Sequence, residues 1–227
     1  MIRHFLQASI IGFFSCVAHG YTGPFLGLDI GAGIFNGDHT YRDITGKDKT
    51  SFTKAGFLYG GYLGYMKEIG KSRVVLAIEG YFHTNTANIK ENLKSGPANT
   101  KVGTYNASRD HSLGIAFIGG KLINPKVLVY LKLAIERGKF KIKYKNSLAT
   151  DTSFTRKKTD TTFIPALGLL HKTHERIFRA HDKIFTGFEY QFSNFYKDIH
   201  TTKSIDNMSH DFSHTEHRVI AKITYMF

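Results

Sequence analysis

The stretch Val127-Leu-Val-Tyr-Leu-Lys-Leu-Ala-Ile-Glu136 shows the pattern that decides the fold. Large apolar residues occupy every odd position from Val127 to Ile135, while the even positions from Tyr130 onward carry Tyr, Lys, Ala and Glu. Side chains alternate between two faces along a β-strand, so this period of two predicts a strand with one apolar face and one mixed face.

Seven further segments show the same alternation, so the sequence predicts eight strands in all. They are residues 25–35, 52–66, 74–84, 109–122, 161–170, 184–192 and 214–227. The segment 161–170 is the least regular, because Pro165 cannot donate a backbone hydrogen bond within a sheet. The content of 12 Tyr, 19 Phe and 22 Gly, with only 4 Pro, is also typical of a twisted sheet.

The predicted connections between these strands alternate between short and long. Short connections at 67–73, 123–126 and 171–183 alternate with long polar ones at 36–51, 85–108, 141–160 and 193–213. Short turns on one side and long polar loops on the other are typical of barrels of the bacterial outer membrane. No segment after the N-terminal region has the about 20 apolar residues that a transmembrane helix needs. We therefore predict an all-β fold, an eight-stranded antiparallel up-and-down transmembrane β-barrel.

The mixed faces of the predicted strands carry charges of both signs at mid-strand positions. They are Asp29, Lys54, Glu79, Lys132, Glu136, Glu189, Arg218 and Lys222. In a narrow eight-stranded barrel these side chains would fill the lumen and pair with one another as a charge network. A soluble lipocalin-like carrier would reverse the arrangement, with the charged face in water and the apolar face around a cavity. Alternation alone does not separate these two kinds of barrel, so the ends of the chain carry the distinction.

The first 20 residues have the composition of a secretory signal peptide. A positive start (Met-Ile-Arg-His) precedes a short apolar run, and small residues at the −3 and −1 positions end the segment at Gly20. We predict cleavage after Gly20, which leaves residues 21–227 as the outer-membrane barrel domain. The single cysteine, Cys16, lies in the predicted signal peptide, so the sequence predicts no disulfide in the barrel.

The C-terminus ends in an aromatic residue on the apolar face of the last predicted strand. Ile223, Tyr225 and Phe227 share that face. This arrangement resembles the terminal-strand signal that the barrel assembly machinery recognises in outer-membrane proteins. Together with the signal peptide, it favours the transmembrane barrel over the lipocalin-like carrier.

Two glycine- and aromatic-rich segments carry a family resemblance. Tyr21-Thr-Gly-Pro-Phe-Leu-Gly-Leu-Asp-Ile-Gly-Ala-Gly33 resembles the first strand of the small outer-membrane proteins of the OmpA, OmpX and opacity-adhesin type. Phe57-Leu-Tyr-Gly-Gly-Tyr-Leu-Gly-Tyr65 resembles their second strand. The resemblance implies an integral surface protein in the outer membrane of a Gram-negative bacterium, with a structural, adhesion or host-interaction role.

The chain is strongly basic, with a formal charge of +13 from 31 basic and 18 acidic residues. Part of this surplus lies in the predicted loop 141–160, which contains Lys141, Lys143, Lys145, Arg156, Lys157 and Lys158. A basic surface favours anionic partners. The expected partners are therefore outer-membrane lipid, the phosphates of lipopolysaccharide and host surface polyanions, whereas no motif predicts specific nucleic-acid binding.

No motif in the sequence predicts a catalytic site, a metal site or a cofactor. Three histidines cluster in the predicted turn 171–183, but their spacing does not match a zinc motif. His83, His111 and Ser112 are candidate groups for a lipid A-modifying enzyme, which would need a base beside its nucleophile. We predict a non-enzymatic surface protein, with a lipid A-modifying enzyme, a small-solute porin and a soluble lipocalin-like carrier as the alternatives.

Overall fold

The fold is given by a computed structural model of the chain. It describes residues 21–43, 46–86, 88–95, 100–146, 154–173, 184–195, 201–203 and 208–227. The predicted signal peptide, residues 1–20, lies outside these residues, so its cleavage stays a prediction. Within them, no helix combines the length and the hydrophobicity needed to cross a membrane.

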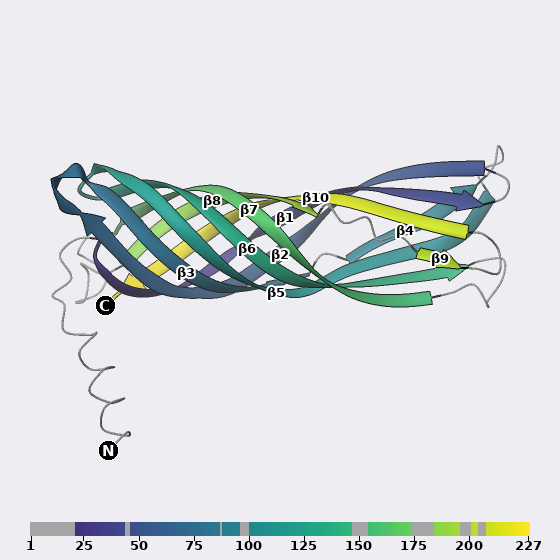
Figure 1. The fold of residues 1–227 in the computed structure, drawn as a ribbon, viewed down its shortest axis with the longest axis horizontal. Coiled ribbons are helices and arrows are strands. Elements are labelled where there is room, and N and C mark those ends of the chain that lie inside the picture. Colours follow the sequence, from purple (N-terminus) through teal and green to yellow (C-terminus); the bar gives the residue numbers. More distant parts are fainter. Residues whose placement is uncertain are drawn as a thin grey trace, which may run out of the picture.

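Nearly all of the described residues lie in antiparallel β-strands (Figure 1). The strands are β1 (Gly23–Asp43), β2 (Gly46–Ile69), β3 (Val74–Asn85), β4 (Asn88–Ser95), β5 (Thr100–Asn124), β6 (Val127–Asn146), β7 (Phe154–Lys172), β8 (Ile184–Phe195), β9 (Thr201–Lys203) and β10 (Met208–Met226). One short 3-10 helix, η1 (Gly70–Ser72), forms the turn between β2 and β3.

Eight of these strands close into a barrel. Each pairs with the next in the order β1-β2-β3-β5-β6-β7-β8-β10, and β10 pairs back with β1 from Phe25–Met226 to Arg42–Ser209. The short strands β4 and β9 follow β3 and β8 in the chain and pair with β5 and β10. The predicted eight-stranded antiparallel barrel is therefore confirmed.

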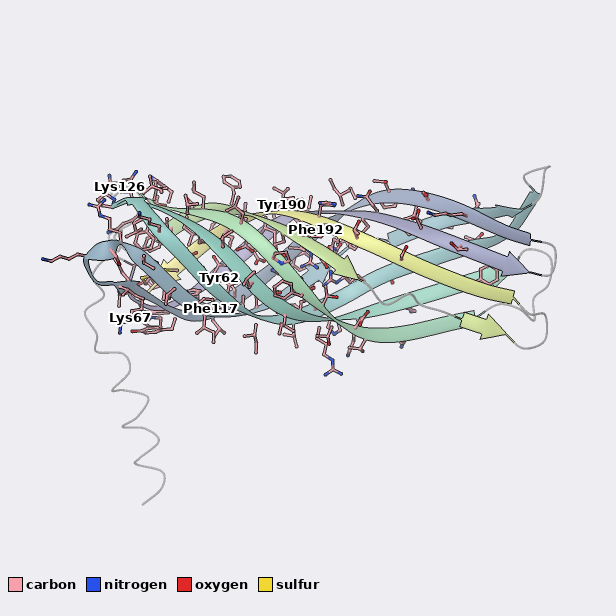
Figure 2. All side chains as sticks on the ribbon, turned by 45° about the horizontal axis from the view of Figure 1, so that its top comes forward. Tyr62, Lys67, Phe117, Lys126, Tyr190 and Phe192 are labelled. Carbon is pink, nitrogen blue, oxygen red and sulfur yellow. The ribbon has the colours of Figure 1, made fainter. Side chains whose placement is uncertain are left out.

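The outer wall of the barrel is apolar and its interior is polar. Leu28 and Leu63 on the outer wall are 68% and 69% exposed, whereas Glu136 and Arg218 on the opposite face are 1% and 0% exposed. Figure 2 shows Phe117 pointing away from the barrel in the same manner. A wall surrounded by lipid must be apolar outside, while the interior tolerates charge. This arrangement is the reverse of a lipocalin-like carrier, which buries its apolar face.

The strands are much longer than this apolar band. On β6 the outward residues are apolar from Val127 to Ile135, about nine residues, which matches the about 9–11 residues of a tilted transmembrane strand. The next outward residue is Arg137, and β6 continues from there to Asn146. Strands β1, β2 and β5 are similarly long, with 21, 24 and 25 residues. The barrel therefore continues beyond the apolar band as a polar extension, on the right in Figure 1.

Most residues of the predicted long loops belong to these strands. The segment 36–51 is mainly the hairpin of β1 and β2, 85–108 contains β4 and the start of β5, 141–160 contains the ends of β6 and β7, and 193–213 contains β9 and the start of β10. The predicted loop boundaries are wrong because the outward face becomes charged where the strands leave the apolar band. On β6 the alternation itself continues from Lys139 to Lys145, where lysines are separated by Phe140, Ile142 and Tyr144, and Tyr144 is buried. The charged outward residues are typical of a loop in composition, although alternation and backbone pairing both continue.

The polar extension consists of two half-sheets. The described pairing of β2 with β3 ends at Leu58–Asn85, and that of β7 with β8 ends at Ala166–Gln191. Beyond these points β9, β10, β1 and β2 pair with one another, and β4 to β7 form the second group. Pro165 lies directly where the β7–β8 ladder ends, so its missing N–H interrupts no described pairing with β8. This position explains how β7 accommodates a proline.

Three tyrosines of the lumen pack directly on glycines of the adjacent strand. The cross-strand pairs are Tyr62–Gly27, Tyr81–Gly114 and Tyr130–Gly168. A Cβ atom on any of these glycines would lie 2.2 Å from the Cζ atom of its tyrosine. The glycines therefore make room for the rings inside a narrow barrel.

We expect the Gly114→Ala substitution to lower the free energy of unfolding by about 1–3 kcal/mol, because the new methyl group overlaps the Tyr81 ring. Gly80→Ala is the matched control, since a Cβ at Gly80 on the outer face of β3 meets no atom within 4 Å. Its expected effect is within about 0.5 kcal/mol. Urea unfolding in lipid vesicles measures both variants, and equal losses would contradict this role of Gly114.

Candidate functional site

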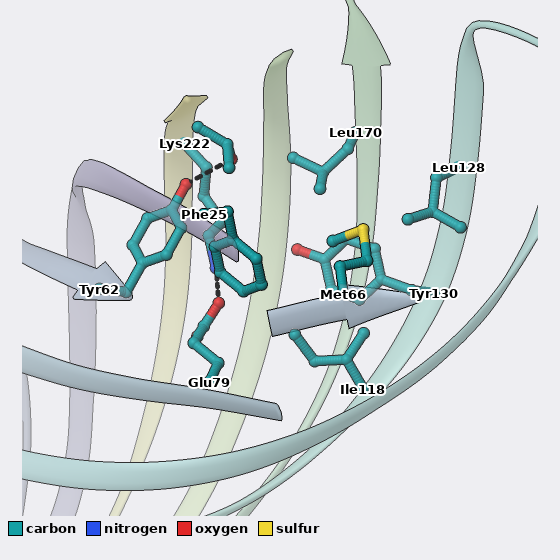
Figure 3. Close-up of a pocket in the computed structure, with 10 residues that line it drawn as sticks. Phe25, Tyr62, Met66, Glu79, Ile118, Leu128, Tyr130, Leu170 and Lys222 are labelled. Carbon is teal, nitrogen blue, oxygen red and sulfur yellow. Dashed lines mark hydrogen bonds and ion pairs between the residues drawn. The ribbon is translucent and has the colours of Figure 1, made fainter. Parts of the chain in front are cut away.

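An apolar layer fills the lumen at the end with the short turns. Figure 3 shows part of this layer around Tyr62 and Tyr130: Phe25, Met66, Ile118, Leu128 and Leu170. Tyr21 extends the layer, with its ring 4.8 Å from that of Phe185 and its hydroxyl donating to the carbonyl of Lys126 at 2.9 Å. This layer separates the charged part of the lumen from the short-turn end.

Next to this layer, two lysines and two glutamates form a closed ring of ion pairs. Lys132 Nζ lies 2.7 Å from Glu79 Oε1 and 3.0 Å from Glu189 Oε1. Lys222 Nζ lies 3.0 Å from Glu79 Oε2 and 3.3 Å from Glu189 Oε2, and Figure 3 shows its contact with Glu79. Tyr130 also donates its hydroxyl to Glu189 at 2.7 Å. The ring joins β3, β6, β8 and β10 across the lumen.

A second cluster of ion pairs centres on Arg218. Its guanidinium donates to both oxygens of Glu136 at 2.8 and 2.9 Å, to Glu216 at 2.8 Å and to Gln191 at 3.0 Å. Arg109 forms ion pairs with the same two glutamates. Bidentate arginine–carboxylate pairs are among the strongest hydrogen-bonded contacts in proteins. The two clusters together fill the middle of the lumen with side chains.

Of the candidate groups for a lipid A-modifying enzyme, His83 and Ser112 are neighbours but His111 is not part of their cluster. His83 Nε2 lies 2.8 Å from Asp29 Oδ2, and Ser112 is the cross-strand partner of His83. All three side chains are buried, but His83 Nδ1 makes no hydrogen bond and lies 3.9 Å from Glu136. The Ser112 hydroxyl is therefore not bonded to this base as a nucleophile would be. His111 lies elsewhere, against an aromatic ring of the outer wall.

The described lumen contains one carboxylate more than its lysines and arginines. The buried carboxylates are Asp29, Glu79, Glu136, Glu189 and Glu216, and the buried cations are Arg109, Lys132, Arg218 and Lys222. The five carboxylates and four cations leave one negative charge among these fully buried side chains, and one of the carboxylates, Asp29, pairs with the imidazole of His83. The large positive surplus of the chain therefore lies outside the described lumen.

Seven of the eight charges predicted for the lumen are buried there: Asp29, Glu79, Lys132, Glu136, Glu189, Arg218 and Lys222. Lys54 shares their face but is only half-buried, farther toward the extension. The sequence interpretation missed Glu216, although it lies two residues from Arg218 and so shares its face. It also missed Arg109, because the β5 register shifts between Arg109 and Ser112 and turns the side chain inward. Periodicity does not predict such a shift.

The residues of the predicted assembly signal lie at the end of β10. Ile223 and Phe227 are exposed on the outer wall, and the Tyr225 and Phe227 rings meet edge to face at 5.1 Å. They are thus available on the outer wall at the end of the chain. Their recognition by the barrel assembly machinery stays a prediction.

The predicted basic loop is largely a strand surface. Its six residues divide into Lys141, Lys143 and Lys145 in β6 and Arg156, Lys157 and Lys158 in β7. The lysines of β6 and Lys157 lie on the outward face, while the side chains of Arg156 and Lys158 lie outside the described part of the structure. The basic surface is therefore held by a sheet and not by a loop.

Within the part of the chain that the structure describes, no three His, Cys, Asp or Glu side chains are grouped so as to hold a metal ion. His171, one of the clustered histidines, is exposed at the end of β7. His174 and His181 lie outside the described residues.

Comparison of the chain with models of protein families and with curated proteins finds no match. Among solved structures, the outer membrane protein OprG from Pseudomonas aeruginosa superposes with a TM-score of 0.54 at 8% identity, covering 91% of this chain and 98% of that one. The chain has the fold of the outer-membrane β-barrels. At such low identity the likeness concerns the fold alone.

Two other outer-membrane proteins also resemble the barrel, with lower TM-scores. Neisserial surface protein A matches with a TM-score of 0.44 and 12% identity, covering 92% of this chain and 100% of that one. Ail, the attachment invasion locus protein of Yersinia pestis, matches with a TM-score of 0.38 and 13% identity, covering 90% and 99%.

Proposed function

We propose that this barrel is an integral surface protein of the outer membrane, with an adhesive or structural role carried by its polar extension and with no catalytic activity. The observation that carries the proposal is the contrast between a lumen filled by ion pairs and strands that continue far beyond the apolar band. In this arrangement the barrel is the anchor, and the extension is the part that meets other molecules.

The filled lumen supports this role over that of a small-solute porin. Lys132, Gln191 and Arg218 are at most 1% exposed, and they belong to clusters that connect strands across the lumen, as the contact between Arg218 on β10 and Glu136 on β6 does. The interior of an eight-stranded barrel is narrow enough for its own side chains to fill it. A path for solutes would require several of these buried ion pairs to separate, which is costly in a low-dielectric interior.

We expect single barrels in planar lipid bilayers to pass no steady current. The physical reason is that the apolar layer and the two ion-pair clusters occupy the lumen in succession. Single-channel recording measures this directly. A steady open-channel current through the native protein would overturn the filled-lumen interpretation and favour the porin.

The paired strands of the extension support an interacting surface. The β1–β2 ladder is continuous up to Asp43–Gly46, well beyond Ala32 on the apolar band. Pairing holds side chains at fixed spacing, which a flexible loop does not do. Such fixed spacing is useful for contact with a partner.

Labelling of intact bacteria tests the orientation that the proposal requires. A cysteine introduced by Ser51→Cys, in the extension, should react with a membrane-impermeant maleimide on intact cells. A cysteine introduced by Ser72→Cys, in the exposed turn η1, should react only after the outer membrane is permeabilised. The opposite pattern would overturn the proposed function.

A shortened hairpin tests the role of the extension. Deleting residues 39–50 and joining Asp38 to Ser51, which are direct partners, through an Asn-Gly turn keeps the register of β1 and β2. We expect the shortened barrel to keep its heat-dependent mobility on SDS gels, while adherence of the bacteria to epithelial cells falls at least tenfold. Equal adherence at equal surface amounts would contradict an adhesive role.

A further inference from the structure

Cations occupy successive outward positions along β6 in the polar extension. They are Arg137, Lys139, Lys141, Lys143 and Lys145. Such positions are about 6.6–6.8 Å apart along a strand. Lys157 on β7 and Lys90 on β4 are exposed on neighbouring strands of the same half-sheet. These seven residues are termed the basic ladder.

The described neighbours of the basic ladder do not neutralise it. Lys141 lies between Ser108 of β5 and Lys157 of β7, and Lys143 lies beside Asn106. None of the ion pairs within the described part of the chain involves a ladder cation. Like charges directly opposite each other destabilise an antiparallel pair. The repulsion between Lys141 and Lys157 therefore favours an anion bound between them, with Ser108 and Asn106 on the neighbouring strand as hydroxyl and amide donors.

On the other half-sheet, the described polar side chains at the β1–β2 hairpin pair with one another. Asp38 pairs with Lys49 at 2.9 Å and accepts a hydrogen bond from the Ser51 hydroxyl at 2.6 Å. The hydrogen bond from Ser51, together with Lys49, holds the pKa of the Asp38 carboxyl below its usual value. Thr53 donates to the Asn36 side chain at 2.8 Å. Among the described side chains of the extension, the exposed cations without an acidic partner are therefore those of the half-sheet that contains β6.

The basic ladder begins where the apolar band ends. Leu133 and Ile135 are exposed on the lipid-facing wall, and Arg137 is the next outward residue of the same strand. Phosphates of the outer leaflet lie at this boundary between hydrocarbon and water. A cation ladder that starts there and continues outward faces lipid headgroups first.

A hollow of about 910 Å³ in the apolar wall reaches the base of the ladder. Its lining includes Leu63, Phe82, Leu113, Ile115, Ile135 and Arg137. Gly61 of β2 and Gly80 of β3 also line it on outward positions, where neighbouring strands carry large apolar side chains. The volume is in the range of sites that hold small ligands, about 300–1,000 Å³.

The two outward-facing glycines of this hollow, Gly61 and Gly80, are not required by the packing of the barrel. A Cβ at Gly80 would meet no atom within 4 Å, and one at Gly61 would have no contact closer than 3.4 Å. Neither has a positive φ. Glycine inside a strand weakens it and often marks the close approach of a ligand. The missing side chains therefore point to an apolar group from outside the chain.

We propose that this side of the barrel binds a phosphorylated glycolipid of the outer leaflet, with its phosphates on the basic ladder and an acyl chain in the hollow. A soluble polyanion would match the ladder but leave the hollow empty. A phospholipid with a single phosphate would fill the hollow but meet only the first cation of the ladder. This binding names a ligand for the proposed surface protein, and it rests on the proposed function because it requires that the extension faces the cell exterior.

Charge-removal variants test the ladder in the full chain reconstituted in phosphatidylcholine nanodiscs. The ladder variant is K139Q/K141Q/K143Q/K157Q. The matched control is K67Q/K71Q/K121Q/K126Q, which removes the same charge from exposed lysines at the short-turn end, where Figure 2 labels Lys67 and Lys126. We expect the Kd for fluorescent lipopolysaccharide to rise at least tenfold in the ladder variant and less than twofold in the control. Equal changes in the two variants would overturn the proposal.

Two further measurements separate the glycolipid from other ligands. Gly80→Leu, which fills the hollow, should weaken lipopolysaccharide binding severalfold and leave binding of the deacylated oligosaccharide unchanged. A Gly80→Leu variant with native lipopolysaccharide affinity would overturn the acyl-chain site. A ladder variant that loses dextran sulfate but keeps lipopolysaccharide would instead assign the ladder to soluble polyanions. If the Ser51→Cys and Ser72→Cys variants are labelled as expected but these binding tests fail, the glycolipid site is wrong and the proposed function stands.

Discussion

Replacing Arg218 with methionine is expected to lower the free energy of unfolding by about 3–5 kcal/mol. Arg218 is fully buried and donates to Glu136, Glu216 and Gln191. Methionine has a similar volume but leaves these acceptors with fewer donors. Removing one partner of a buried pair is more harmful than removing both, because it leaves an uncompensated charge away from water.

The balance of charge in the lumen predicts that removing Arg218 and removing its ion-pair partner Glu136 cost different amounts of stability. Arg218→Met leaves five carboxylates against three cations, whereas Glu136→Gln leaves four against four. Glutamine also keeps a hydrogen-bonding group beside Arg218 and Arg109. We therefore expect Glu136→Gln to cost less than half as much as Arg218→Met, although both break the same ion pair.

Urea unfolding in lipid vesicles, followed by the heat-dependent mobility of the folded barrel, measures both substitutions. The double variant R218M/E136Q completes the cycle and isolates the coupling between the two side chains. We expect it to be more stable than the sum of the single losses indicates. Equal losses in the two single variants, with additive effects in the double variant, would contradict a lumen controlled by charge balance.

The faces of the strands could be predicted from the sequence because lipid and lumen impose opposite demands on alternate residues. From Val127 to Glu136 every outward residue is apolar, and the charges Lys132 and Glu136 are buried as the alternation indicates. The same alternation places Glu216 in the lumen, because it lies two residues from Arg218 on the same strand. Within a regularly paired strand, the face that a charge occupies is thus a local property of the sequence.

The ion pairs could not be predicted in the same way, and the extension is hidden by its charged composition. Lys132 and Glu79 are partners because barrel closure and strand register bring β6 and β3 to the same level, and no local pattern encodes that register. Arg109 depends on a shift in the pairing of β5. In the extension the outward face is charged, so Lys141 and Lys143 look like loop residues, although they alternate with Ile142 and Tyr144 and lie in a paired strand.

Replacing Leu131 with arginine is expected to destabilise the barrel in lipid by about 2–4 kcal/mol, the cost of a charge near the bilayer midplane on the lipid face. Leu131 is 63% exposed and lies midway along the apolar stretch of β6 between Val127 and Ile135. Thr53→Arg is the control, because Thr53 is exposed on the outer face of the extension. There the expected cost falls to about 0–1 kcal/mol, since the guanidinium stays in water.

The Leu131 substitution also separates the transmembrane barrel from a soluble one on physical grounds. If water surrounded the wall, arginine in place of an exposed leucine would cost little and would reduce a large apolar patch. If lipid surrounds it, the same change removes apolar contact and places a charge in hydrocarbon. Urea unfolding of both variants in lipid vesicles measures the difference. A penalty confined to Leu131 locates the hydrocarbon layer on β6, and Arg137 then lies at its edge, where the basic ladder begins.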